Sequence, residues 1–332
     1  MFRPNLIRNV YDHTMENYIY KYLKIKMHHY ILERDFDNIF VIGIYDRNVS
    51  ISKYEKKGKL FNWQRPTAEI KNNTLYIKCP SGSDYVMHYA SLIATYLAVN
   101  NRKFDHVFYN NPSIKENENL ILNSNLKEIK PKEIVVIGYG LEAIAGRKNW
   151  LGKGSFLYKN SIDKNVTFIG CKHSIWGDIA GRVTSFLANL GVKTVIYIGK
   201  LGSINPDYNP NESLATGNVS LLNGKFIVWD NLFNKIKDPI LKRGNHYTSS
   251  STILETKEWI KKNSNFDFVD PEIGYMAKAA NESGINFSYL HIISSNLSQI
   301  HHENLSNERS QTILNKRKNL LLKIRNILYK EI

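Results

Sequence analysis

The sequence predicts an α/β protein in which a mainly parallel or mixed sheet is flanked by helices, with an additional α/β region at the N-terminal end. Short apolar runs alternate with amphipathic segments of helical period along the second half of the chain. Those runs are continuously apolar, as is typical of strands buried on both faces. A polar stretch with prolines at both ends, residues 110–132, precedes this half, so we divide the chain into residues 1–130 and 131–332.

The first region shows a weaker version of the same pattern. Residues 38–44 (NIFVIGI) and 74–78 are expected to be strands, and residues 84–99 place apolar side chains at helical spacing. These elements indicate an α/β arrangement, but none of them carries a recognisable chemistry. The role of residues 1–130 therefore stays open.

The second region yields four strands and three helices. Its apolar runs are IVVIG at 134–138, VTFIG at 166–170, TVIYIG at 194–199 and FSYLHII at 287–293. Between the second and third runs, residues 175–190 have one apolar face, and Gly191 follows as a cap, which predicts a βαβ unit. A second amphipathic helix is expected at 272–282, and a third at about 313–328 with lysines and arginines outside its apolar face.

Composition limits the classes of partner and compartment. The 332 residues are 42% hydrophobic, and 45 Lys and Arg stand against 30 Asp and Glu, a formal charge of +15 that favours anionic partners. Charge spread along the whole chain favours a solvated surface over a nucleic-acid site. The only cysteines, Cys79 and Cys171, have no metal-ligand spacing, and no apolar run could form a signal core or cross a bilayer. We expect a soluble cytoplasmic protein without a metal or a membrane partner.

Two glycine-rich segments follow apolar strands. Gly138-Tyr139-Gly140 begins a G-x-G-x-x-A pattern, which in a dinucleotide-binding fold would bring a pyrophosphate to a helix N-terminus, although the next strand does not end in the acidic residue that a ribose needs. An NAD-dependent oxidoreductase is thus one alternative. The other segment is Gly199, Lys200, Leu201, Gly202 and Ser203, where glycines would let the backbone approach a base or sugar, unless they only form a tight turn.

Polar residues gather at the same expected sheet edge. Glu272 begins a helix, where it would serve either as a cap or as a grip on sugar hydroxyls. Ser295 and Asn296 end the last strand, where they could hydrogen-bond a heterocycle. Candidates for an anion site near the start of the 175–190 helix are Lys172, His173 and Arg182, although Arg182 also fits a solvated helix surface.

In its order of segments, the chain from about Ile134 onward resembles the purine nucleoside phosphorylase and nucleosidase superfamily. The order is IVVIGYGLEA, then FIGCKHSIWGDIAGRVTSFLANLGVKTVIYIGKLGSINPD, then FVDPEIGYMAKAANESGINFSYLHIISSNL, over roughly the last 200 residues. Lys200 stands where that family usually has a small residue, and Pro271 stands where it usually has Met.

The resemblance implies a phosphorylase-like fold and cleavage of an N-glycosidic bond, by phosphate or by water, to give a free base and a ribose derivative. It places Leu201, Gly202 and Ser203 at the base and ribose, Glu272 at the ribose hydroxyls, and Asn296, or Ser295 by a one-residue shift, at the base. It also implies a nucleoside or nucleotide ligand, no cofactor beyond phosphate as a co-substrate, and a homo-oligomer. A nucleotide-binding regulatory protein without turnover remains a further alternative.

Overall fold

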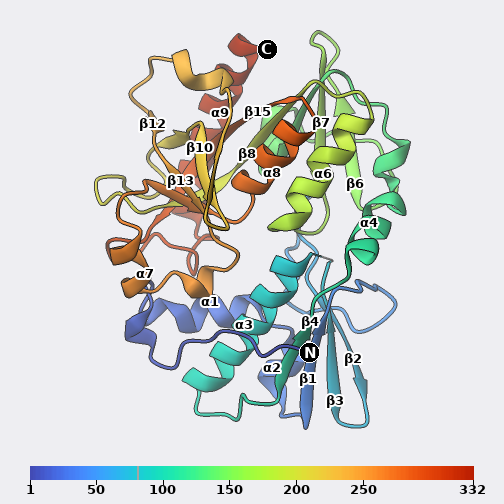
Figure 1. Ribbon diagram of the computed structural model, residues 1–332, viewed down its shortest axis with the longest axis vertical. Helices are drawn as coiled ribbons and strands as arrows, with labels where there is room; N and C mark the ends of the chain where they lie inside the picture. Colours follow the sequence, from blue (N-terminus) through green and yellow to red (C-terminus); the bar gives the residue numbers. More distant parts are fainter. Residues whose placement is uncertain (81) are drawn as a thin grey trace.

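The computed structural model describes residues 1–80 and 82–332 and contains two sheets. The smaller sheet has four strands in the order β2-β3-β1-β4 and lies at the lower end of Figure 1. The larger sheet has eleven strands and fills the upper part. The predicted α/β class and mainly parallel sheet are confirmed, because β5 pairs in parallel with β7 and β8, and β8 pairs in parallel with β15.

The long helix α3 of the N-terminal region packs on its sheet, and α1 packs on α3. Pairing of β1 with both β3 and β4 is parallel, and α3 packs against β1 and β4. Its elements are η1 (Val10–Asp12), α1 (Tyr18–Lys26), α2 (His29–Glu33), β1 (Asn38–Ile42), β2 (Thr67–Lys71), β3 (Thr74–Lys78), α3 (Ser83–Val99) and β4 (Val107–Asn110).

The C-terminal region is built around β8. One edge of β8 pairs first with β5 and then with β14, and the other pairs with β15. Its elements are α4 (Ile114–Leu122), η2 (Asn125–Glu128), β5 (Ile134–Gly138), α5 (Leu141–Ile144), β6 (Phe156–Asn160), β7 (Val166–Cys171), α6 (Asp178–Asn189), β8 (Thr194–Ser203), β9 (Leu214–Thr216), β10 (Val219–Leu222), β11 (Lys225–Val228), η3 (Leu232–Lys235), β12 (Leu241–Arg243), β13 (His246–Thr248), η4 (Thr252–Leu254), α7 (Lys257–Lys262), β14 (Phe268–Asp270), α8 (Ile273–Glu282), β15 (Asn286–Asn296) and α9 (Gln311–Glu331).

Both faces of the large sheet are covered, which explains the continuously apolar strands. Val135 and Val195 belong to the core under α6 and α8, whereas Val136 and Ile196 belong to the core under α9. Helices α6 and α8 lie side by side on the first face (Figure 1). Successive residues of a strand point to opposite faces, so a strand between two helical layers needs apolar residues at every position.

Several predicted bounds shift for physical reasons. Strand β8 continues through the glycine segment to Ser203, because residues 202–203 pair with β14 and β15 instead of turning. Helix α6 begins at Asp178, three residues later than expected. The polar stretch at 110–132 contains α4 and η2, whose Ile121 and Leu126 enter the core of the C-terminal region.

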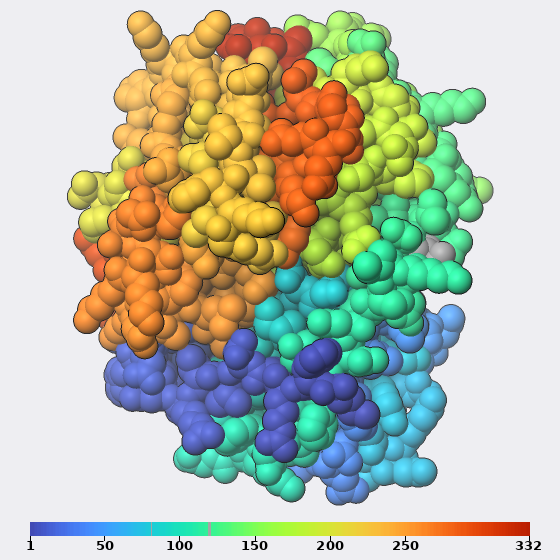
Figure 2. All heavy atoms as spheres, viewed as in Figure 1, coloured from blue at the N-terminus to red at the C-terminus, as the bar shows by residue number. Residues whose placement is uncertain are grey.

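The two regions are joined by a pair of helix N-termini. The Asp84 Oδ2 of α3 accepts a hydrogen bond from the Asp178 backbone N–H at 3.2 Å, and the Asp178 carboxylate accepts from the backbone N–H groups of Ser83 and Asp84 at 3.2 and 3.3 Å. Figure 2 shows N-terminal residues, in blue, packed directly against the orange C-terminal region. No described helix has both the length and the apolar composition that a bilayer crossing requires.

Candidate active site

A cavity of about 220 Å³ lies at the carboxyl end of β8, between the two regions. The three segments that the sequence placed together all line it: residues 199–202 of β8, Glu272 at the start of α8, and Ser295 near the end of β15. Parallel strands deliver their carboxyl ends to one edge of a sheet, which is why β8 and β15 meet there. The N-terminal region supplies much of the opposite wall, including Tyr22, Tyr85 and His88.

Glu272 faces the cavity because a neighbouring carboxylate caps its helix. Asp270 Oδ1 accepts hydrogen bonds from the backbone N–H groups of Glu272 and Ile273, both at 2.9 Å. Glu272 is the N-cap residue of α8, yet its side chain makes no capping hydrogen bond. Burial, and then the negative charge of Asp270, raise the pKa of Glu272 well above its usual range. The result is a buried carboxyl group that lines the cavity beside the Tyr197 hydroxyl and is not used by its own helix.

Asp270 is held in a buried network that includes two histidines. His246 Nε2 lies 3.1 Å from Asp270 Oδ1, and His291 Nε2 lies 3.5 Å from Asp270 Oδ2. On its other side, His246 Nδ1 lies 2.9 Å from the Ser220 hydroxyl. Burial opposes ionisation of Asp270, but the two histidines hold its pKa well below the usual range. Among the described residues, no group of His, Cys, Asp and Glu has the arrangement of a metal site.

Gly199 is required by this network. A Cβ at position 199 would collide with the imidazole ring of His291, the residue opposite it on β15. The ring also packs edge-on against Tyr197, with centroids 4.6 Å apart. The glycine seen in the sequence thus makes room for a histidine, and it leaves the strand backbone bare where it borders the cavity.

Four of the predicted site residues lie outside the cavity lining. Ser203 donates to the Asn205 carbonyl at 2.9 Å, and the Asn296 amide donates to the Asn205 and Tyr208 carbonyls at 2.9 and 3.0 Å. Both side chains thus fix the loop after β8. Lys172 and Arg182 are absent from the lining as well. His173 does line the cavity, and so do Lys200 and Leu201.

The G-x-G-x-x-A segment has a packing explanation. Helix α5, which follows it, has only four residues, too short to present the N-terminal dipole that a pyrophosphate would need. A Cβ at Gly138 would meet the Ile198 carbonyl, and one at Gly140 would meet the Leu321 side chain. Both glycines have positive φ, 129° and 70°. The segment does line the cavity, but packing accounts for both glycines and the short helix offers no pyrophosphate site, which disfavours the dinucleotide alternative.

The sequence interpretation missed the residues that the N-terminal region contributes. Lys26, Lys56, Lys59 and Arg65 line the cavity, and Glu308 joins them from the segment before α9. Glu255 also lines it, and burial raises its pKa to about 8. Except for Lys26, these residues come from loops without a periodic pattern, so no spacing rule could have brought them together.

Comparison with known proteins gives matches in structure only: no family model and no curated protein matches the sequence. A Campylobacter jejuni 5'-methylthioadenosine/S-adenosylhomocysteine nucleosidase matches with 16% identity and a TM-score of 0.48, over 60% of this chain and 99% of that one. A futalosine hydrolase mutant of Helicobacter pylori matches with 17% identity and a TM-score of 0.45, over 58% and 98%.

A Plasmodium knowlesi homologue of the Plasmodium falciparum purine nucleoside phosphorylase matches with 12% identity and a TM-score of 0.44, over 61% of this chain and 91% of that one. The similarity is one of fold, over part of the chain.

Proposed function

We propose that the protein binds a nucleoside or nucleotide in the cavity at the end of β8 and cleaves or transfers at its N-glycosidic bond. The observation that carries this proposal is the position of Glu272, a buried carboxyl group that its own helix does not use and that shares the cavity with Ser295 and the β8 backbone. A pentose offers hydroxyl donors to such a carboxyl group. Because the glycines of β8 lack side chains, a flat ring can approach the strand backbone closely.

The chemistry follows from what the sugar becomes as the bond breaks. The ribosyl group acquires positive charge in an oxocarbenium-like transition state, so a carboxylate at its hydroxyls favours that state over the neutral substrate. Hydroxyl groups that donate to Glu272 stabilise its ionised form, which offsets the burial that raises its pKa. Ser295 is the residue we assign to the base, because the Asn296 amide is engaged by the loop at 205–208.

A binding protein without turnover is the second candidate, and one observation favours it. Neither Ser295 nor Asn296 is a carboxylic acid that could protonate the departing base, and the Asn296 amide faces the loop. Such a protein would keep the ligand in the same cavity. The two candidates differ only in whether free base appears.

The test incubates the protein with adenosine, guanosine, inosine and their 5'-monophosphates, with and without inorganic phosphate. Chromatography measures the free base that is released. We expect release from at least one of these compounds. Dependence on phosphate, with formation of ribose 1-phosphate, would identify phosphorolysis. Tight binding without release would favour the second candidate, and neither binding nor release of any of them would overturn both.

A further inference from the structure

One end of the cavity carries a concentration of positive charge. Five cationic side chains line it, and we call them the cation cluster: Lys26, Lys56, Lys59, Arg65 and Lys200. Among the described residues, only Glu308 forms ion pairs with members of the cluster, with Lys200 and, at 3.8 Å, with Lys26. Glu308 also lies close to a third cation, because Arg317 Nη1 is 3.7 Å from its carboxylate.

Two members of the cluster are buried without a partner. Lys56 and Arg65 are each only 8% exposed, and in the part of the chain that the structure describes neither side chain forms an ion pair. Arg65 Nε also lacks any hydrogen-bond acceptor there. A buried charge without a partner is costly, and a bound anion is what removes that cost.

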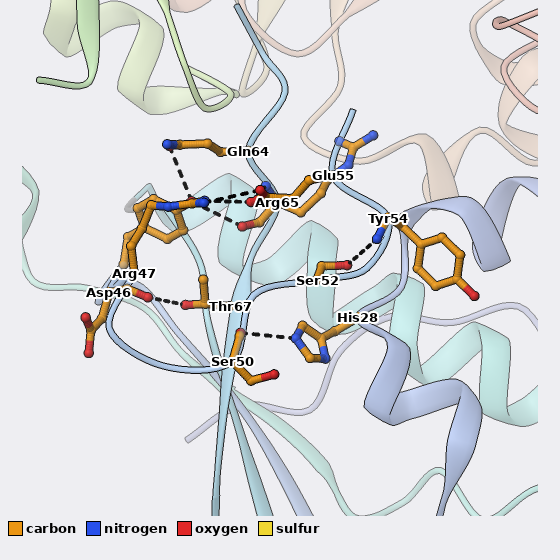
Figure 3. Close-up of polar contacts among 11 residues, drawn as sticks. His28, Asp46, Arg47, Ser50, Ser52, Tyr54, Glu55, Gln64, Arg65 and Thr67 are labelled. Atoms are coloured by element: carbon orange, nitrogen blue, oxygen red, sulfur yellow. Dashed lines mark hydrogen bonds and ion pairs between the residues drawn. The ribbon is translucent and has the colours of Figure 1, made fainter. Parts of the chain in front are cut away.

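A carboxylate close to Arg65, that of Glu55, already pairs with another arginine. Arg47 binds Glu55 through two hydrogen bonds, of 2.6 and 3.2 Å, which Figure 3 shows as dashed lines. Glu55 reaches Arg65 only at its backbone N–H, at 3.3 Å. The Arg65 guanidinium, which could have paired with Glu55, is thereby left for the cavity.

The fold holds this cluster in place from both regions. In the loop between β1 and β2, the backbone N–H groups of Asn62 and Trp63 donate to the carbonyls of Cys171 and Lys172 at the end of β7, at 2.8 and 2.9 Å. Phe61 packs directly on Gly170, where a Cβ would collide with its ring. Lys59 and Lys200, one from each region, lie 5.3 and 5.1 Å from the centroid of the Tyr139 ring.

The cations also disturb one another's protonation. Burial, and then the charge of Arg65, lower the pKa of Lys56 well below its usual range. Burial lowers the pKa of Lys26 to about 8 and that of Lys200 to about 7, although Glu308 acts to raise both. An anion placed among them would reverse these shifts, because a neighbouring negative charge favours the protonated amine.

We propose that the cation cluster is a phosphate-binding subsite, so that the ligand held at Glu272 is a nucleoside that carries one or more phosphate groups. Lysine and arginine are the side chains that bind phosphoryl oxygens by charge-assisted hydrogen bonds. The subsite is formed largely by residues 1–130, which gives that region a function in the reaction. Free inorganic phosphate has the same chemistry and could occupy the same subsite, so the experiment compares it with phosphate attached to a nucleoside. The nucleoside part of this inference rests on the proposed function.

The experiment measures binding by calorimetry for adenosine, AMP, ADP, ATP, inorganic phosphate and the corresponding guanosine compounds. We expect the phosphorylated compounds of at least one base to bind ten-fold or more tightly than the nucleoside, because the phosphate adds charge-assisted hydrogen bonds to those of the nucleoside. Lys56→Gln and Arg65→Gln should each remove most of that gain in affinity. Lys57→Gln is the matched control, because Lys57 is the next residue and is exposed.

The outcomes separate the subsite from the proposed function. Tighter binding of nucleotides that depends on Lys56 and Arg65, without base release, supports the subsite and contradicts glycosidic cleavage. The subsite is overturned if the protein releases base from nucleosides and neither phosphate, attached or free, nor the two substitutions changes that release. Glycosidic cleavage would then still stand. Binding of inorganic phosphate that saturates the cluster, with no gain for AMP over adenosine, would identify free phosphate as the ligand. Circular dichroism of each variant confirms that it is folded.

Discussion

At the N-terminus of α8, two acidic residues that are two positions apart in the chain have different environments and different roles. Asp270 is ionised, is held by His246 and caps the helix, whereas Glu272 is buried beside it with a raised pKa. Two like charges in one buried site cannot both ionise easily, so the partners of Asp270 decide which of the two carries the charge. From the sequence, Glu272 was expected either to cap the helix or to bind a ligand. In the structure Asp270 caps the helix.

Glu255 yields a prediction about pH and stability. Burial raises the pKa of Glu255 to about 8, whereas an unfolded chain has a Glu pKa of about 4.3. Between these values the folded protein keeps a proton that the unfolded protein has released, so this residue lowers stability as pH rises. We expect Glu255→Gln to exceed the wild type by roughly 2–5 kcal/mol in free energy of unfolding at pH 9, and by much less at pH 5.

Urea denaturation at the two pH values measures this difference. Glu282→Gln, a substitution at an exposed position, should show no comparable change with pH. An advantage of Glu255→Gln that is equal at pH 5 and pH 9 would contradict the assigned pKa.

At the scale of elements, hydrophobic periodicity predicted the strands and helices that form the core, but little of the loop conformation. The strands at 134–138 and 74–78 were predicted with the bounds that the structure has, because their apolar residues have no other place to be buried. The continuation of β8 to Ser203 was not predicted, because glycines usually mark turns and here they accommodate His291 and Leu297. Contacts with residues distant in sequence therefore determine the conformation of that segment.

The paired N-termini of α3 and α6 depend on Gly177. This glycine has a φ of 62°, and a Cβ there would collide with the Asp84 side chain that caps α6. We expect Gly177→Ala to lower the free energy of unfolding by about 2–3 kcal/mol, from the strained backbone and the displaced cap together. Gly224→Ala is the control, because Gly224 has a φ of 77° with open space around its Cβ position, and its cost should be about 1 kcal/mol. An equal loss of unfolding free energy at the two positions would show that the paired helix N-termini do not contribute to stability.

At the scale of the whole molecule, the cavity explains why half of the site escaped prediction. The edge formed by β8, α8 and β15 follows from strand order, so residues 199–202, Glu272 and Ser295 could be predicted to meet. The opposite wall comes from loops of the N-terminal region, whose positions depend on hydrogen bonds such as Asn62 to Cys171. A sequence contains no local signal for such contacts.

The same contacts predict that the two regions unfold together. Cys79 lies in the N-terminal core and Cys171 at the end of β7, and both are buried. Burial raises the pKa of both thiols, that of Cys171 to about 12, so neither reacts readily in the folded state. We expect a thiol reagent, with mass spectrometry of each cysteine, to label both at the same urea midpoint. Labelling of Cys79 at a clearly lower urea concentration than Cys171 would show that the regions unfold independently.

The proposed function depends most on Glu272, and the most direct test is the rate of base release by Glu272→Gln, which keeps the shape of the side chain and removes the carboxylate. The measurement uses whichever compound the wild type cleaves, with Glu282→Gln, on the same helix and exposed, as the control. We predict a loss of about 100-fold or more in kcat/KM for Glu272→Gln, with an unchanged circular dichroism spectrum, and a wild-type rate for the control. A Glu272→Gln protein that releases base at the wild-type rate would contradict the assignment of this cavity as the active site.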